Sequence, residues 1–172
     1  MINLRLPAAA KIAEELAVAI IITQIIIIAP SANFRHDKCM SQNEDGIFSA
    51  ILADMLRAIP DLGPSFAAYE YRDLPTICLE NVLLPHLIAL SADLDNRVQL
   101  KTALAWVEHH AGSPNVAVRN LIGNGICEPL MTTKANHFAT LFPHLGPATM
   151  TLCRMQLHHF KVNPEIKRML GG

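Results

Sequence analysis

The stretch DGIFSAILADMLRAIP, residues 45–60, decides the fold class. Asp45 can cap the first turn of a helix, and Pro60 cannot continue one. Between them, apolar residues recur at a spacing of 3.6 residues on one face, while Asp54 and Arg57 fall on the opposite face. The apolar face consists of Ile47, Phe48, Ile51, Leu52, Met55, Leu56 and Ile59. The stretch therefore predicts an amphipathic helix that packs against other helices.

Toward the C-terminus, the prolines and glycine of residues 60–75 predict an irregular connection. Helical apolar periods then predict helices over residues 77–92, 97–111, 116–122, 134–142 and 147–161. Pro85 either kinks its helix or marks the true start. Gly123 and Gly125 indicate either a close approach of two helices or a break into two short ones.

Composition supports the same fold class. Hydrophobic residues make up 51% of the 172 residues and aromatic residues only 5%, so the core must be built mainly from aliphatic side chains. Such a core favours packed helices over a β-sandwich. No repeat of about forty residues is present. We therefore predict an all-α fold, a compact helical bundle or a short HEAT-like stack of about six to seven helices.

The N-terminal run LAVAIIITQIIIIA, residues 16–29, is the least conventional part of the chain. It is shorter than the roughly twenty residues of a membrane-spanning helix. We expect residues 1–30 to form an apolar segment with a buried helix from near Pro7 to Pro30. A buried strand and a cleaved or membrane-associated segment remain alternatives. Residues 31–46 are predicted to be a linker and residues 47–172 a helical domain. A cytoplasmic location is expected, with a secreted or membrane-associated protein as the alternative.

Charge and cysteine usage exclude several classes of protein. Residues 41–110 carry ten acidic and four basic side chains, whereas residues 111–172 carry two and six. No basic cluster with interleaved aromatic residues is present, so no nucleic-acid partner is expected. The four cysteines include no CxxC pair, which disfavours a zinc ribbon or finger. Buried reduced thiols are the expected state.

Few residues are candidates for catalysis or metal binding. The pairs His109-His110 and His158-His159 would form a metal site, together with Glu108, only if their helices packed side by side. Cys127 with His137 is a conceivable nucleophile and base, and Glu108 with Glu128 a conceivable acid and base. Salt-linked or capping roles suit these residues better. No phosphate-binding loop, serine elbow or zinc-protease motif occurs, and no cofactor is predicted.

The region 56–160 resembles a family of bacterial helical domains of unknown function. The likeness is carried by AIPDL (58–62), LLPHL (83–87), AWVEH (105–109), VAVRNLI (116–122), ICEPL (126–130) and LGP (145–147). Residues 93–96 and 128–130 occupy the places of the family's acidic turn and its Glu-x-Leu end. The resemblance implies an α-helical domain, sometimes suspected to be an immunity-type binding protein, with no catalytic residues.

Together these features predict a non-catalytic protein-binding helical module, to which the resemblance adds the immunity type, a protein that occludes its partner, here through an acidic face. The expected binding residues are Glu80, Asp93, Asp95, Trp106 and Glu108. A metal-dependent enzyme that uses the histidine pairs is one alternative. An oligomeric scaffold, in which the isoleucine-rich segment joins copies of the chain, is the other.

Overall fold

The computed structural model describes residues 42–158 and 161–171, and in these ranges the chain is all-α, with eight helices and no strand. The predicted fold class is thus confirmed, with slightly more helices than expected. All described residues belong to one compact unit, Met40–Gly172. The predicted N-terminal helix lies outside the described residues, as does most of the predicted linker.

The first half of the domain begins with α2 (Gln42–Ala58), so residues 42–46, expected in the linker, are helical. The short η1 (Pro60–Leu62) and α3 (Gly63–Ala68) follow, where an irregular connection was expected. Next comes one continuous helix made of α4 (Pro75–Cys78), η2 (Leu79–Leu83) and α5 (Leu84–Ser91). The turn η3 (Leu94–Asn96) leads into α6 (Arg97–Ala111).

The second half begins with another continuous helix, made of α7 (Val116–Ile122), η4 (Gly123–Cys127) and α8 (Glu128–Thr132). It is followed by α9 (Ala135–Leu141), η5 (Phe142–His144) and α10 (Pro147–Gln156). The prediction of one last helix over 147–161 is wrong at its end, because α10 stops at Gln156 and a separate helix, α11 (Pro164–Met169), follows. Asn163 caps α11 by accepting a hydrogen bond from the N–H of Glu165.

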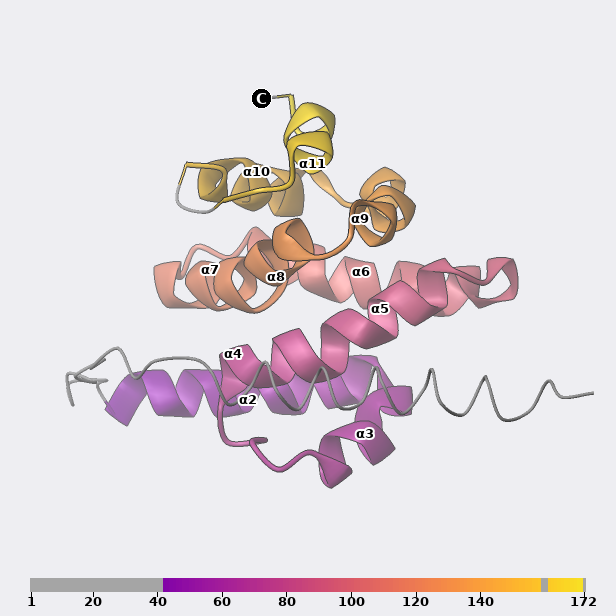
Figure 1. Cartoon of the computed structure of the whole chain (residues 1–172). Coiled ribbons are helices and arrows are strands. Elements are labelled where there is room, and N and C mark those ends of the chain that lie inside the picture. The colour runs from indigo at the N-terminus through magenta and orange to yellow at the C-terminus, as the bar shows by residue number, and fades with distance from the viewer. Residues whose placement is uncertain (1–41, 159–160, 172) are drawn as a thin grey trace, which may run out of the picture. The chain divides into compact units, whose positions relative to one another are not determined.

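Spatial order follows chain order in this domain. Figure 1 shows α2 and α3 at one end of the stack, α6, α7 and α8 in the middle, and α10 and α11 at the other end. The continuous helix from Pro75 to Ser91 rises from beside α2 toward the level of α6. The described part of the acidic region, residues 42–110, therefore lies toward one end of the domain, and that of the basic region, residues 111–171, lies toward the other.

Each of the two long helices contains a π-turn, and a proline directly follows the residue whose N–H closes that turn. In η2 the N–H of Leu84 donates to the carbonyl of Leu79, and in η4 the N–H of Glu128 donates to that of Gly123, each five residues back. Pro85 and Pro129 follow directly, in the second position of α5 and α8. A proline ring inside a helix collides with the carbonyl four residues earlier, and the wider turn relieves that collision. Both helices consequently continue past their prolines.

The two long helices cross where Gly125 meets α4 and η2. A Cβ atom at Gly125 would lie 2.8 Å from the Cβ of Leu79 and 3.1 Å from the carbonyl oxygen of Thr76. Of the two interpretations of the glycine pair, the close approach is therefore the one observed, and the helix continues through it. The surrounding core is aliphatic, as composition predicts, with one fully buried aromatic ring, Phe138, among the described residues.

No single helix in the described ranges combines the length and apolarity needed to cross a membrane. One bent pair, Pro75–Ser91 with Leu94–Ala111, meets the criteria of length and composition only when its two members, which meet at 114°, are taken together. Both members contribute to the domain core.

Candidate functional site

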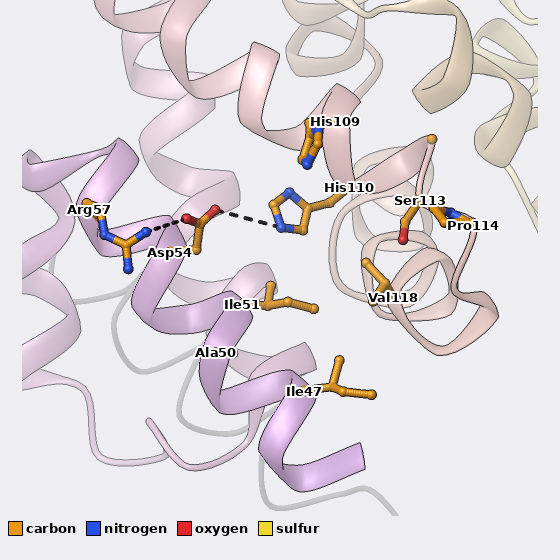
Figure 2. A pocket seen from close by; sticks show the side chains of 11 residues that line it. Ile47, Ala50, Ile51, Asp54, Arg57, His109, His110, Ser113, Pro114 and Val118 are labelled. Carbon is orange, nitrogen blue, oxygen red and sulfur yellow. Dashed lines mark hydrogen bonds and ion pairs between the residues drawn. The ribbon is translucent and has the colours of Figure 1, made fainter. Parts of the chain in front are cut away.

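A groove with a volume of about 680 Å³ runs along α2 (Figure 2). One wall is a stripe on α2, with Ile47, Ala50, Ile51, Asp54 and Arg57. The other wall consists of the end of α6, the loop after it and the start of α7, with His109, His110, Gly112, Ser113, Pro114 and Val118. We call this feature the α2 groove. Its apolar part lies toward Ile47 and its polar part toward Arg57.

Asp54 organises the polar part of the α2 groove. Its Oδ1 atom accepts a hydrogen bond of 2.9 Å from Arg57, one turn away on the same helix. Its Oδ2 atom accepts a hydrogen bond of 3.0 Å from the indole N–H of Trp106 on α6. The Nε2 atom of His110 lies 3.8 Å from the same oxygen. One carboxylate thus joins α2 to α6 and holds the guanidinium of Arg57 at the surface, where that side chain is 75% exposed.

Both ring nitrogens of His110 face protein atoms. Nδ1 lies 3.0 Å from the carbonyl oxygen of Trp106, and Nε2 faces Asp54. The ring also stacks on Trp106, with 4.3 Å between the ring centroids. A general base must reach a substrate proton with a nitrogen lone pair. His110 is instead a buried part of the α2–α6 contact, whereas the adjacent His109 is exposed at the groove.

Trp106, expected to be a binding residue, is buried, and its indole is held by Asp54. Glu108, also expected to bind a partner, caps α10 from across the domain. Its Oε1 accepts a hydrogen bond of 2.7 Å from the N–H of Ala148. Its Oε2 accepts bonds from the N–H and the hydroxyl of Thr149, at 3.0 and 2.8 Å. The structure places both side chains in contacts within the domain.

The pKa of Glu108 reflects this capping role. Partial burial raises the pKa, but the hydrogen bonds from Thr149 and Ala148 outweigh that effect, so the net pKa lies below its ordinary value. An anion at a helix N-terminus is further favoured by the helix dipole. Both oxygens of Glu108, one member of the conceivable acid–base pair, are thus engaged by the start of α10. Burial raises the pKa of Glu128, and the nearby charge of Glu80 raises it further.

The remaining expected binding residues lie on other elements. Glu80 is half-buried in the π-turn η2. Asp93 precedes η3 and accepts a hydrogen bond from the N–H of Asp95, and both residues are exposed. None of the five expected binding residues lines the α2 groove, although Trp106 supports its polar part from behind. Asp54 and Arg57, which the helical spacing places opposite the apolar face of α2, are the sequence signal for this groove.

Three of the four expected metal ligands lie in the described part of the chain. His109 and His110 are on α6, while His158 follows the end of α10 and is exposed. His159 lies outside the described residues. Among the residues that the structure does describe, no group of three or more His, Cys, Asp or Glu side chains is placed to hold a metal ion.

Cys127 and His137, the conceivable nucleophile and base, each contact another residue. Cys127 is fully buried, and its thiol points to the carbonyl of Thr149 at 3.9 Å. A hydrogen bond with Cys153 and burial both raise the pKa of Cys127 well above its ordinary value. The Nδ1 atom of His137 lies 3.4 Å from the hydroxyl of Thr133. A buried thiol with a raised pKa is a poor nucleophile.

Comparison of the whole chain with protein-family models, with curated proteins and with solved structures found no match.

Proposed function

We propose that this domain is a non-catalytic protein-binding module, of the immunity type in that it occludes its partner, and that the α2 groove receives a helical segment of that partner. The observation that carries the proposal is the stripe Ile47, Ala50, Ile51, Asp54 and Arg57, which lines the groove from an apolar to a polar part. Such an arrangement suits an amphipathic helix laid into a groove.

The dimensions of the α2 groove support a helical ligand. The stripe from Ile47 to Arg57 extends for about 15 Å at the 1.5 Å rise of an α-helix. A partner helix of about ten residues would match that length and present side chains at i, i+3, i+4 and i+7. Ile51 and Val118 form the floor, and Ala50 leaves room above it because its side chain is small. These features favour insertion of large apolar side chains from the partner.

The polar part of the α2 groove would fix the direction in which the partner helix binds. Because both oxygens of Asp54 are already bonded within the domain, the guanidinium of Arg57 is held in place before binding. The remaining N–H groups of this guanidinium can donate hydrogen bonds to a carboxylate of the partner. Exposed acidic residues on the same half of the domain, Asp61, Glu70 and Asp73, would steer a partner that is basic elsewhere on its surface.

A photo-crosslinking amino acid at Ala50 tests the proposal, with Ala89 as the matched control. Both alanines are exposed on helices, and only Ala50 lines the groove. In the lysate of the source organism, position 50 should give a discrete protein adduct that position 89 does not. The variant A50R should then lose co-purification of that protein, while A89R retains it. Equal adducts at both positions, or none, would contradict the proposal.

A further inference from the structure

A second groove lies on the far side of α6 from the Asp54 contact and has a volume of about 540 Å³. Its lining comes from one continuous stripe of α6 and from the connection before α10. The α6 stripe consists of Arg97, Leu100, Lys101, Leu104, Ala105 and Glu108, and the connection contributes His144 and Gly146. We call it the α6 groove. Its volume falls within the range of about 300–1,000 Å³ typical of small-molecule sites.

The α6 groove is apolar along its floor. Leu100 and Leu104 lie one turn apart and are mostly buried, and Ala105 is exposed beside them. The stripe from Arg97 to Glu108 extends for about 16 Å along the helix. Glu108 closes one end, with both oxygens engaged by the N-terminus of α10. The groove therefore offers an elongated apolar surface with no uncommitted carboxylate in its lining.

The other end of the α6 groove is cationic. Arg97 and Lys101 are four residues apart on α6, so their charges lie on the same face of the helix. Within the described ranges, neither Arg97 nor Lys101 forms an ion pair with a carboxylate. Asp93, the nearest capping acid, is engaged by the N–H of Asp95 and the amide of Asn96.

The placement of Arg97 and Lys101 destabilises the domain when no anion is bound between them. Like charges at i and i+4 repel by a few tenths of a kcal/mol. Arg97 is also the first residue of α6, where a positive charge opposes the helix dipole. An anion bound between Arg97 and Lys101 would reverse both effects. The apolar floor that leads away from these cations would hold a hydrocarbon chain attached to the anion.

From this combination we propose that the α6 groove binds a free single-chain anionic amphiphile, a medium-chain fatty carboxylate. Its carboxylate lies between Arg97 and Lys101, and its chain lies along Leu100, Leu104 and Ala105. This site shares no lining residue with the α2 groove, so the proposal for the α6 groove does not depend on the proposed function of the α2 groove.

Titration calorimetry of the full-length chain with three probes tests the chemistry. Decanoate should bind saturably. Decanol, with the same chain and no charge, should bind at least about tenfold more weakly, and acetate, with the same head and no chain, should give no measurable heat. Equal affinity for decanoate and decanol, or the absence of saturable decanoate binding, would overturn the proposal.

Three variants test the location, each checked for native helicity by circular dichroism. K101E should weaken decanoate binding by at least about tenfold, and A105W should block the floor and abolish binding. K167E alters an exposed lysine on α11, outside the groove, and should bind like the parent chain. Backbone amide shifts on addition of decanoate should concentrate at residues 97–105 and 144–146. A loss of affinity in K167E equal to that in K101E, or shifts confined to other residues, would reject the site.

Discussion

At the scale of single residues, Glu108 shows how a side chain can mislead from sequence. In the run AWVEHH it is a surface acid near the end of a helix, with no local sign of a partner. The structure gives it three hydrogen bonds to Ala148 and Thr149, forty residues later. α10 begins Gly146-Pro147 and has no capping side chain of its own, so its free N–H groups need an acceptor from elsewhere.

Removing this cap should destabilise the domain. We expect E108A to lower the free energy of unfolding by about 1–2 kcal/mol, because three donors at the start of α10 lose their acceptor. E70A, at an exposed acid, should change it by less than about 0.5 kcal/mol. Urea denaturation at pH 7 gives the comparison. Equal stability of the two variants would contradict the capping role.

The lowered pKa of Glu108 also predicts a pH dependence. A carboxyl whose pKa is lower in the folded than in the unfolded chain stabilises the fold above its unfolded pKa, and that contribution is lost as pH falls through the folded value. The stability difference between the parent chain and E108Q should therefore be full at pH 7 and shrink below pH 4.5, the ordinary value for this group. Urea titrations across this range provide the measurement, and a difference independent of pH would refute it.

The carboxylate of Glu108 also restricts which residue can occupy position 146. Its φ of −79° and ψ of 168° are open to any residue, so backbone conformation does not require glycine. A Cβ atom there, however, would overlap the carboxylate of Glu108. We expect G146A to destabilise the domain by about 1–2 kcal/mol at most, because the flexible carboxylate of Glu108 must then leave its capping position.

The double variant E108A/G146A isolates the cause. With the carboxylate gone, the added methyl group has space, so the double variant should be about as stable as E108A alone. The coupling energy from this cycle, measured by urea denaturation, should be about 1 kcal/mol or more. Additive losses would show that the methyl group collides with something other than Glu108.

At the scale of helices, the periodicity of apolar residues predicted most helices. It did not predict the features that depend on contacts between helices. The apolar spacing of residues 45–60 predicted α2, but Asp45 does not start this helix, which begins at Gln42. The predicted range 97–111 matches α6. The π-turns were not predicted, because a proline within an apolar run suggests a kink or an end. Whether the helix instead widens and continues depends on packing against the second long helix, which no local pattern contains.

The candidate site was less predictable than the fold, because it depends on contacts between residues far apart in the sequence. Asp54 and Trp106 are fifty-two residues apart in sequence, and their contact follows from how α2 crosses α6. Arg57 and Ala50 gain a role only when the loop after α6 comes to lie opposite α2. α11 did carry a local signal, Asn163-Pro164-Glu165, which is a capping residue followed by a first-turn proline and an acid.

The crossing of the two long helices gives a prediction at this scale. G125A should lower stability by about 1–3 kcal/mol, because its methyl group would meet the side chain of Leu79 and the carbonyl of Thr76. G46A is the matched control, since no atom lies within 4 Å of a Cβ placed there in α2, and alanine is the better helix former. It should raise stability by about 0.5–1 kcal/mol. Thermal or urea unfolding should give opposite signs for the two changes.

At the scale of the whole domain, the charge division of the sequence becomes a division in space. Exposed acids at Asp61, Glu70 and Asp73 belong to the end with α2 and α3, and exposed bases at Lys167 and Arg168 belong to α11 at the other end. A domain with such a dipole orients a charged partner before contact. The α2 groove lies in the acidic half, which is the end that a basic partner would approach.

The cooperativity of the whole domain can be measured through its thiols. Cys78, Cys127 and Cys153 are free and buried, on three helical segments whose side chains belong to one core. Burial and the charge of Asp73 raise the pKa of Cys78, and that of Cys127 is also raised, so few thiolates form even where solvent penetrates. Modification should therefore require opening of the core as a unit.

We expect native C39S, which removes the one cysteine outside the described residues, to react with an aromatic disulfide reagent at least about a hundredfold more slowly than the same chain in denaturant. All three thiols should react at one rate, because each is exposed by the same global opening. A cysteine introduced at the exposed Ala89 should react at the denatured rate in the native protein and so controls for the reagent. If Cys78 reacted much faster than Cys127 and Cys153, the end of the domain with α2 to α4 would open separately, and the α2 groove would belong to a less stable part of the fold.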